Sequence, residues 1–243
     1  MPLPMIHLAV AVGVHTLAGR EPSAAFLLGS IAPDAIHMRD GADRSDKERT
    51  HLEGEGDIPG GGWVRPYRRP PGSFPETDDP YGEESVRRFL TGDYPIDPDL
   101  AAGYGAHLLT DRYWTHDLAQ AYRELQARIH LSPEELRTIY YREMDQIDFE
   151  LYRTMPWREA VWAQLAAVEP QAVPGLLSAD EISRWRDRTL NWFDGLMQEP
   201  GITPQYVMMD DIRRFIDQAA GRIAALYERW GVVPYDRPAD PSP

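Results

Sequence analysis

The stretch Gly103-Tyr-Gly-Ala-His107-Leu-Leu-Thr-Asp111-Arg-Tyr-Trp-Thr-His116 has the pattern of a helix that carries polar side chains within an apolar run. His107 and Asp111 are four residues apart, so on an α-helix they share one face, with Cβ atoms roughly 5–6 Å apart. An imidazole nitrogen and a carboxylate oxygen at that separation can bind one cation. Gly103 and Gly105 indicate that another backbone comes close to this helix. The stretch therefore predicts a helix with a metal site on one face.

Helix signals dominate the rest of the chain and predict an all-α fold. Apolar patterns predict helices over 5–17 and 23–30. Two capping boxes, Ser132-Pro-Glu-Glu135 and Ser178-Ala-Asp-Glu181, predict the starts of helices of roughly 20 residues. Thr203-Pro204 predicts the start of a last long helix. No run of residues alternates as strands do, so we expect one multi-helix domain over 1–234, with the metal site in a cleft between helices.

Two segments are rich in glycine and proline and predict irregular structure. Residues 54–80 include Gly60-Gly-Gly62 and several prolines, which predicts a long loop inserted in the domain. Loops of this length are either functional lids or mobile insertions, and the composition leaves both open. The aromatic and arginine side chains of the loop would suit a lid over a phosphorylated substrate. The tail, 235–243, is proline-rich, and we expect it to be disordered.

Composition limits the kinds of partner. The chain has 25 basic and 39 acidic residues, a formal net charge of −14, which opposes bulk binding of nucleic acid. It has no cysteine, so a metal must be held by nitrogen and oxygen ligands. No apolar run reaches the length of about 18 residues that spans a bilayer. The apolar run Leu8 to Val14 is too short for that and follows no basic residue, so we expect no signal peptide and a cytoplasmic protein.

Three further polar residues lie in apolar or turn contexts upstream. They are His7 in an apolar helix, Asp34 after Pro33, and His51 after Thr50. Each has an ordinary structural interpretation when taken alone: a buried histidine, a turn cap and a surface histidine. Together with His107 and Asp111 they supply enough donors for one divalent metal ion with an open position, or for two ions that share a carboxylate.

Four other residues are possible additional ligands. His37 follows Asp34 by three residues and joins the site if that segment is helical. His116 is nine residues after His107, so it faces the other way unless the helix breaks near Trp114. Two carboxylates three residues apart on one predicted helix, Asp145 and Asp148, are further candidates.

The order of these motifs resembles the zinc-dependent phospholipase C family, which is related to the single-strand-specific zinc nucleases. The stretches that carry the resemblance are Pro4-Met-Ile-His7, Phe26-Leu-Leu-Gly-Ser-Ile-Ala-Pro-Asp34, Lys47-Glu-Arg-Thr-His51 and Gly103-Tyr-Gly-Ala-His107-Leu-Leu-Thr-Asp111-Arg-Tyr-Trp114. They lie in the first half of the chain. The resemblance implies an all-helical hydrolase of phosphate esters that uses a metal-activated water.

The resemblance also implies roles for individual residues. His51, His107 and Asp111 would bind one metal ion, and Asp111 would bridge to a second ion that His7 also binds. Asp34 would be a ligand or the catalytic general base. The family completes a third metal site with a later His-x-x-x-Glu pair. After His116 that spacing occurs only at His130 and Glu134, where His130 lies beside the capping box and is interpreted as a surface residue, so we expect one or two ions. Zinc is implied by the resemblance, and iron, manganese and nickel suit the same ligand types.

The expected function is therefore a metal-dependent hydrolase that acts on a small phosphate ester. Two alternatives remain open from the sequence. One is a helical phosphohydrolase built on the adjacent pair His116-Asp117. The other is a non-catalytic helical protein in which the metal only links helices. A closed site with four protein ligands would favour the second alternative, and an open coordination position would favour catalysis. The identity of the ester and the oligomeric state are not encoded in any motif that we recognise.

Overall fold

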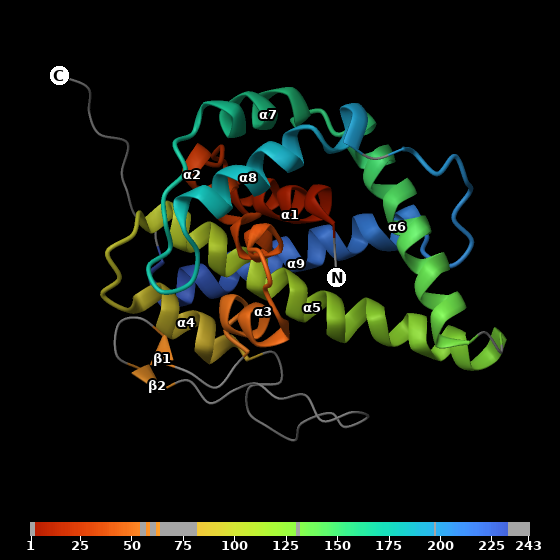
Figure 1. The fold of residues 1–243 in the computed structure, drawn as a ribbon, viewed down its shortest axis with the longest axis horizontal. Helices are drawn as coiled ribbons and strands as arrows, with labels where there is room; N and C mark the ends of the chain where they lie inside the picture. Colours follow the sequence, from red (N-terminus) through yellow and green to blue (C-terminus); the bar gives the residue numbers. More distant parts are fainter. Residues whose placement is uncertain are drawn as a thin grey trace.

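The computed structural model describes residues 3–53, 57–58, 62–63, 82–129, 132–196 and 198–232, and these are mainly helical (Figure 1). The α-helices are α1 (Pro4–Leu17), α2 (Ala24–Gly29), α3 (Arg44–Thr50), α4 (Glu83–Thr91), α5 (Pro98–Ile129), α6 (Pro133–Thr154), α7 (Arg158–Ala167), α8 (Ala179–Leu190) and α9 (Met209–Trp230). A 3-10 helix, η1 (Ala32–Met38), and a π-helical turn, η2 (Trp192–Leu196), complete the helical elements of these ranges. Two short strands, β1 (Asp57–Ile58) and β2 (Gly62–Trp63), pair antiparallel. The prediction of an all-α fold is confirmed.

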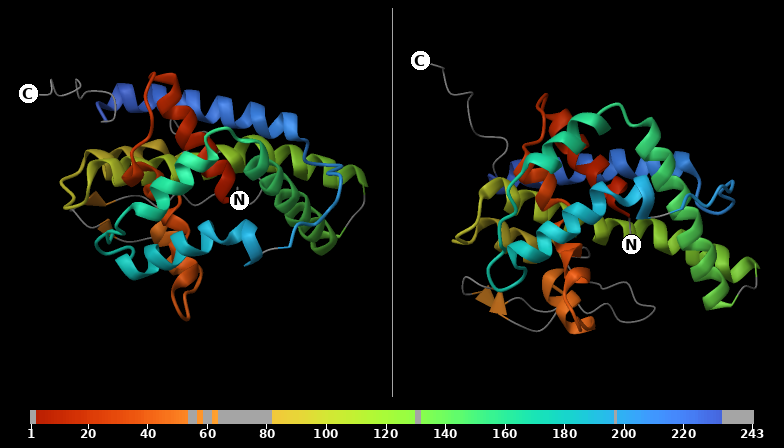
Figure 2. Two further views of the ribbon diagram at one scale, coloured as in Figure 1. Left: turned by 90° about the horizontal axis from the view of Figure 1, so that it is seen from above. Right: turned by 45° about the horizontal axis from the view of Figure 1, so that its top comes forward.

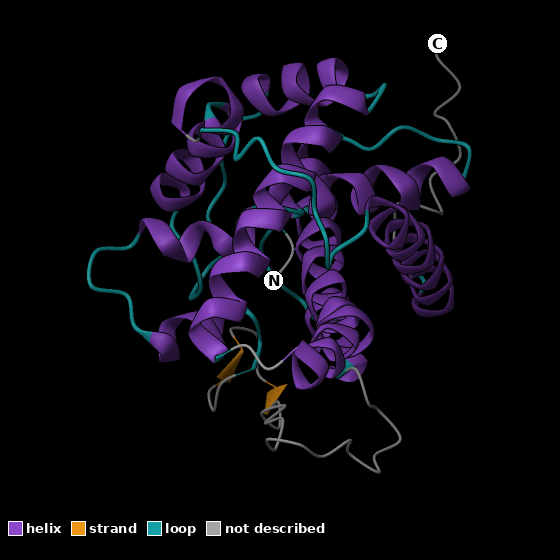
Figure 3. Cartoon of the chain, turned by 90° about the vertical axis from the view of Figure 1, so that its right-hand side faces the viewer, coloured by secondary structure: helices purple, strands orange, loops and turns teal. Residues whose placement is uncertain are grey.

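Helices α1 and α5 form the centre of the domain. The apolar side chains of α1 are buried on nearly all sides of the helix, as expected for a helix enclosed by others. Helix α9 packs along both α1 and α5 and covers them on one side (Figure 2). On another side, α8 packs across η1, and α7 contacts α2 and α8. Figure 3 shows from a third direction that helices make up most of the part of the chain that is drawn in colour. None of the described helices is both long and apolar enough to cross a membrane.

Two glycines let α2 and α5 approach closely. A Cβ atom on Gly103 would lie 2.0 Å from the carbonyl oxygen of Phe26, and one on Gly29 would lie 2.2 Å from that of Leu100. A larger residue at either position would force the two backbones apart. The close backbone approach that Gly103 and Gly105 predicted is confirmed at Gly103. At Gly105 the nearby atoms belong to side chains, since a Cβ there would lie 2.9 Å from Leu90 Cδ1. The contact between α2 and α5 at Gly29 and Gly103 brings the end of α2 to the face of α5 that carries His107.

The helix starts that the sequence predicted from capping boxes are confirmed. Ser132 and Glu135 exchange side-chain and main-chain hydrogen bonds at the start of α6. Ser178 and Glu181 do the same at the start of α8. Ser23 accepts a hydrogen bond from the main-chain N–H of Phe26 at 3.1 Å and caps α2. Each cap satisfies main-chain donors that the first turn of a helix leaves free.

Two helix boundaries were predicted wrongly. Helix α8 has 12 residues, not about 20, because the chain turns through η2, where Gly195 has φ 147°. Helix α9 starts at Met209, not at Thr203-Pro204. The buried carboxylate of Glu143 on α6 explains the late start. It accepts hydrogen bonds from the main-chain N–H groups of Gln205, Tyr206 and Val207, which fixes these residues in an irregular segment.

The two predicted irregular segments lie mainly outside the described residues. Only 57–58 and 62–63 of the predicted loop 54–80 are described, and the whole of the predicted tail 235–243 lies outside. The prediction of a lid therefore stays a prediction.

Candidate metal centre

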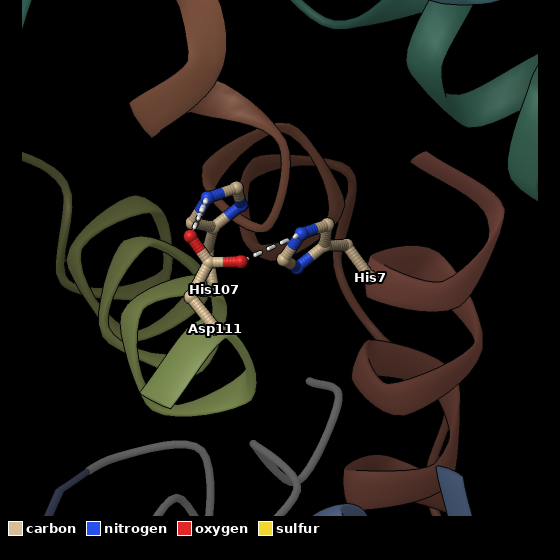
Figure 4. A group of neighbouring side chains, drawn as sticks. All are labelled: His7, His107 and Asp111. Atoms are coloured by element: carbon tan, nitrogen blue, oxygen red, sulfur yellow. Dashed lines mark ion pairs between the residues drawn. The ribbon is translucent and has the colours of Figure 1, made fainter. Parts of the chain in front are cut away.

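Four elements bring the five sequence-predicted ligands together. His7 comes from α1, Asp34 from η1, His51 from the residue that ends α3, and His107 and Asp111 from α5. All five side chains are buried. In Figure 4 the carboxylate of Asp111 lies beside the imidazole rings of His7 and His107, with one oxygen directed at each ring. Residues from position 7 to position 111 of the sequence thus meet at one place.

The donor atoms of these residues face one another at similar separations. Asp111 Oδ1 lies 3.5 Å from His7 Nε2, and Asp111 Oδ2 lies 3.5 Å from His51 Nε2 and 3.8 Å from His107 Nε2. Asp34 Oδ1 lies 3.6 Å from His51 Nε2. Two ligands bound at about 2.0–2.1 Å to a tetrahedral ion are roughly 3.3–3.5 Å apart. The atoms are therefore too far apart for good hydrogen bonds but close to the spacing of ligands around one ion.

The donor atoms fall into two overlapping groups. One group is His7, His107 and Asp111, and the other is Asp34, His51 and His107; within each group the ligand atoms lie within 4.8 Å of one another. The two oxygens of Asp111 point in different directions, one to His7 and the other to His51 and His107. This arrangement suits a single ion or two ions bridged by the Asp111 carboxylate.

Several buried nitrogen and oxygen atoms of this donor set have no hydrogen-bond partner among the residues that the structure describes, which indicates whether a metal ion fits the site. The atoms His7 Nε2, His51 Nε2, His107 Nε2, Asp34 Oδ1 and Asp111 Oδ1 are buried and form no hydrogen bond within the described part of the chain. Leaving one buried polar atom unsatisfied costs about 1–3 kcal/mol. Five such atoms directed at one place form a set that a cation would satisfy, so the residues fit a divalent metal ion.

Main-chain carbonyl groups orient two of the histidines. His107 Nδ1 lies 2.9 Å from the carbonyl oxygen of Ser30, and His51 Nδ1 lies 3.0 Å from that of Lys47. In each ring Nδ1 donates its proton to the carbonyl, so Nε2 is the nitrogen left to bind an ion at the centre. Histidines that bind metals are commonly oriented in this way by their second nitrogen.

Burial and neighbouring charges set the protonation of these groups. Burial and the adjacent His107 lower the pKa of His7 well below its usual value, and burial also lowers the pKa of His107. The two rings stack at a centroid distance of 3.8 Å, which suits neutral imidazoles. Burial lowers the pKa of His51, but the carboxylates of Asp34 and Asp111 outweigh burial and raise it. Burial raises the pKa of Asp34, but contact with His51 and the nearby positive groups outweigh it and hold the pKa well below its usual value.

Arg112 on α5 forms hydrogen bonds that hold the main chain at His51 and the start of α4. Its guanidinium is buried and donates to the carbonyl oxygen of Gly82, to the hydroxyl of Ser85 at 2.9 Å and to the carbonyl oxygen of His51 at 3.4 Å. It thereby links the end of α3 to the start of α4. Next to His51, Leu52 has φ 54°, a left-handed conformation that is rare for leucine. Hydrogen bonds from Arg112 and the unusual backbone conformation of Leu52 thus help to fix the position of His51.

The four possible additional ligands lie outside both donor groups. His37 is nearest, with Nε2 3.7 Å from Asp34 Oδ1. Helix α5 continues past Trp114, so His116 lies on the opposite face of the helix from His107. His116 Nδ1 lies 2.7 Å from Asp117 Oδ1. Asp145 and Asp148 lie on α6; Asp148 is fully buried, and neither of its oxygens has a hydrogen-bond partner among the described residues.

Sequence reasoning missed Lys47 as a member of the site. Its ammonium nitrogen lies 3.7 Å from Asp34 Oδ1. The available signal was its spacing, because Lys47 precedes His51 by four residues and so shares a face of α3 with it.

Comparison of the chain with protein-family models, with curated proteins and with solved structures gives no match.

Proposed function

We propose that this protein is a metal-dependent hydrolase of phosphate esters, with its metal centre at His7, Asp34, His51, His107 and Asp111. The observation that carries the proposal is the set of buried donor atoms without hydrogen bonds that converge from α1, η1, α3 and α5. The resemblance of the same motifs to the zinc-dependent phospholipase C family supports a phosphate ester as substrate and zinc as the metal. The donors are all nitrogen and oxygen, which iron, manganese and nickel also accept.

Each side chain of the metal centre would have its own role. His51 and His107 present Nε2 to the ion because their Nδ1 groups are held by carbonyl oxygens. Asp111 offers one oxygen to each donor group. Asp34 serves as a ligand or as the base that accepts a proton from the attacking water; both roles need the ionised carboxylate that its surroundings favour. A bound divalent ion would polarise a phosphoryl oxygen and lower the pKa of a coordinated water.

The first test is elemental analysis of the purified protein together with the variants His107→Ala and Asp111→Ala. One to two equivalents of metal per chain are expected in the wild type, with loss of metal in both variants. Asp117→Ala is the matched control, since Asp117 lies on the same helix but binds His116 and Arg222, the latter at 2.8 Å. Retention of metal in Asp117→Ala would speak against the alternative site at His116-Asp117, and its loss would favour that site.

The second test is hydrolysis. Wild type loaded with metal should hydrolyse at least one small phosphate ester from a panel of monoesters and diesters, and chelation followed by metal addition should abolish and then restore the activity. Hydrolysis that chelation leaves unchanged would refute the proposal. Bound metal without activity on any ester would favour the non-catalytic alternative, in which the ion only links helices.

A further inference from the structure

A lysine lies at the solvent-facing edge of the candidate metal centre. Lys47 Nζ lies 3.7 Å from Asp34 Oδ1 and 3.4 Å from His37 Nε2. The side chains of Lys47 and His37 are 29% and 48% exposed, whereas His51, the most exposed histidine of the centre, is 4% exposed. Solvent therefore reaches the centre on the side where Lys47 and His37 lie.

Helix α3 gives Lys47 two separate roles. Its main-chain carbonyl accepts the hydrogen bond from His51 Nδ1 at 3.0 Å and orients that ring. Its side chain extends along the same face of the helix toward Asp34. A substitution of the side chain therefore removes the positive charge and leaves the hydrogen bond to His51 in place.

His37 positions the lysine. An ammonium group only donates hydrogen bonds, so the contact between Lys47 and His37 requires an unprotonated Nε2 on His37. His37 thus acts as an acceptor that holds the ammonium beside Asp34.

The charges of the centre indicate what kind of group Lys47 would bind. Asp34 and Asp111 carry two negative charges, so one divalent ion would bring the five ligands to zero and two ions would bring them to +2. Lys47 adds one more positive charge at their edge, in a chain whose formal net charge is −14. A cation next to bound metal ions is unfavourable unless an anion lies between them. With Lys47 the total is +1 for one ion and +3 for two ions, so the centre with two ions is suited to a group with two negative charges.

We infer that Lys47, held by His37, binds a non-bridging oxygen of the substrate's phosphoryl group, and that the protein prefers a dianionic terminal phosphate. The inference rests on the proposed function and names the substrate class of the same site. It assigns to Lys47 a contact with substrate that none of the five metal-binding residues provides.

The test measures binding of inorganic phosphate to the full chain reconstituted with Zn²⁺, by isothermal titration calorimetry at pH 8, with bound metal per chain determined on the same samples. Lys47→Met should weaken phosphate binding about 10- to 100-fold, as expected for a lost hydrogen bond to a charged group, at unchanged metal content. Lys47→Arg should restore most of the affinity. The matched control is Arg44→Met on the same helix, since Arg44 is 92% exposed and pairs with Glu48; it should leave phosphate binding unchanged.

A second pair of variants tests the role of His37. His37→Phe should weaken phosphate binding in the wild type but have no further effect in the Lys47→Met background, because it acts through Lys47. An equal effect in both backgrounds would refute the positioning role. Dimethyl phosphate, which carries one negative charge, should bind more weakly than inorganic phosphate. Equal binding of the two would refute the preference for a dianion.

The outcomes separate this inference from the proposed function. Unchanged phosphate affinity in Lys47→Met at full metal content would overturn the role of Lys47 and leave the metal centre intact. A loss of metal in Lys47→Met would also overturn it, since the lysine would then act on metal loading. Absence of metal from the reconstituted wild type would reject the proposed function, and the inference with it.

Discussion

Replacement of Gly103 by alanine should separate α2 from α5 and disturb the metal centre. The new Cβ would lie 2.0 Å from the carbonyl oxygen of Phe26 and 2.9 Å from the main-chain nitrogen of Ser30. Ordinary contacts of a Cβ atom start near 3.4 Å, so the two backbones would have to move apart by about 1.4 Å. Both clashing atoms belong to the main chain, so no change of side-chain rotamer can relieve the contact.

The magnitude follows from two opposing effects. Overpacking of a well-packed core costs typically about 1–3 kcal/mol and occasionally more, and a clash between main chains belongs at the upper end. Alanine in place of glycine in a helix returns about 1 kcal/mol. We therefore expect Gly103→Ala to lower the free energy of unfolding by about 2 kcal/mol or more. The matched control is Gly221→Ala in α9, where a Cβ meets nothing within 4 Å; it should raise the free energy of unfolding by about 0.5–1 kcal/mol.

The same displacement should reach the candidate ligand His107. Its Nδ1 lies 2.9 Å from the carbonyl oxygen of Ser30, which directly follows α2. An opening of about 1 Å would break this hydrogen bond and release the ring, and loss of such a supporting contact typically costs 10- to 100-fold in metal affinity. Gly103→Ala should therefore bind metal more weakly, while Gly221→Ala should bind it as the wild type does.

The assay is urea unfolding of the metal-free proteins, followed by a metal titration against a competing chelator. A Gly103→Ala protein as stable as Gly221→Ala, with wild-type metal affinity, would refute the argument that the glycine contact sets the position of His107. A destabilised variant with unchanged metal affinity would refute only the link to the metal centre.

Two further predictions concern buried ionisable groups. Asp148→Asn should raise the free energy of unfolding of the metal-free protein by about 1–3 kcal/mol, because the burial of the Asp148 carboxylate costs more than its interaction with the main-chain N–H of Met5 returns. Burial and the charge of Asp145 raise the pKa of Asp148, so the gain in unfolding free energy should be larger at pH 8 than at pH 5. A loss of bound metal in the variant would instead indicate that Asp148 is a metal ligand. Lowering the pH from about 6.5 to 5.5 should destabilise the metal-free protein. The pKa values of His7 and His107 are lowered in the folded state, so both rings stay neutral there, whereas the same histidines take up protons in the unfolded chain. Each of these two groups contributes a slope of up to about 1.4 kcal/mol per pH unit in urea unfolding, while the raised pKa values of His51 and Asp148 act in the opposite direction. The measurement is therefore made in the Asp148→Asn background, where a gain in stability over this interval would contradict the assignment.

The sequence alone determined the helical class, several helix starts and the residues that form the donor set. These features depend on local physics. A capping box such as Ser132 with Glu135 satisfies main-chain donors within four residues, and the spacing of His107 and Asp111 places both on one face of any regular helix. The order of the motifs selected His7, Asp34 and His51 as their companions. The structure brings all five together.

Only the tertiary structure decided how these residues are presented and where two helix boundaries lie. The late start of α9 depends on Glu143, which is some sixty residues earlier in the chain and accepts hydrogen bonds from Tyr206 and its neighbours. The nitrogen of His107 that faces the centre depends on Ser30, which reaches α5 only because Gly103 has no side chain. Lys47 became part of the site only when α3 was placed beside η1. Such contacts join residues far apart in sequence, and helical periodicity contains no information about which faces of different helices will meet.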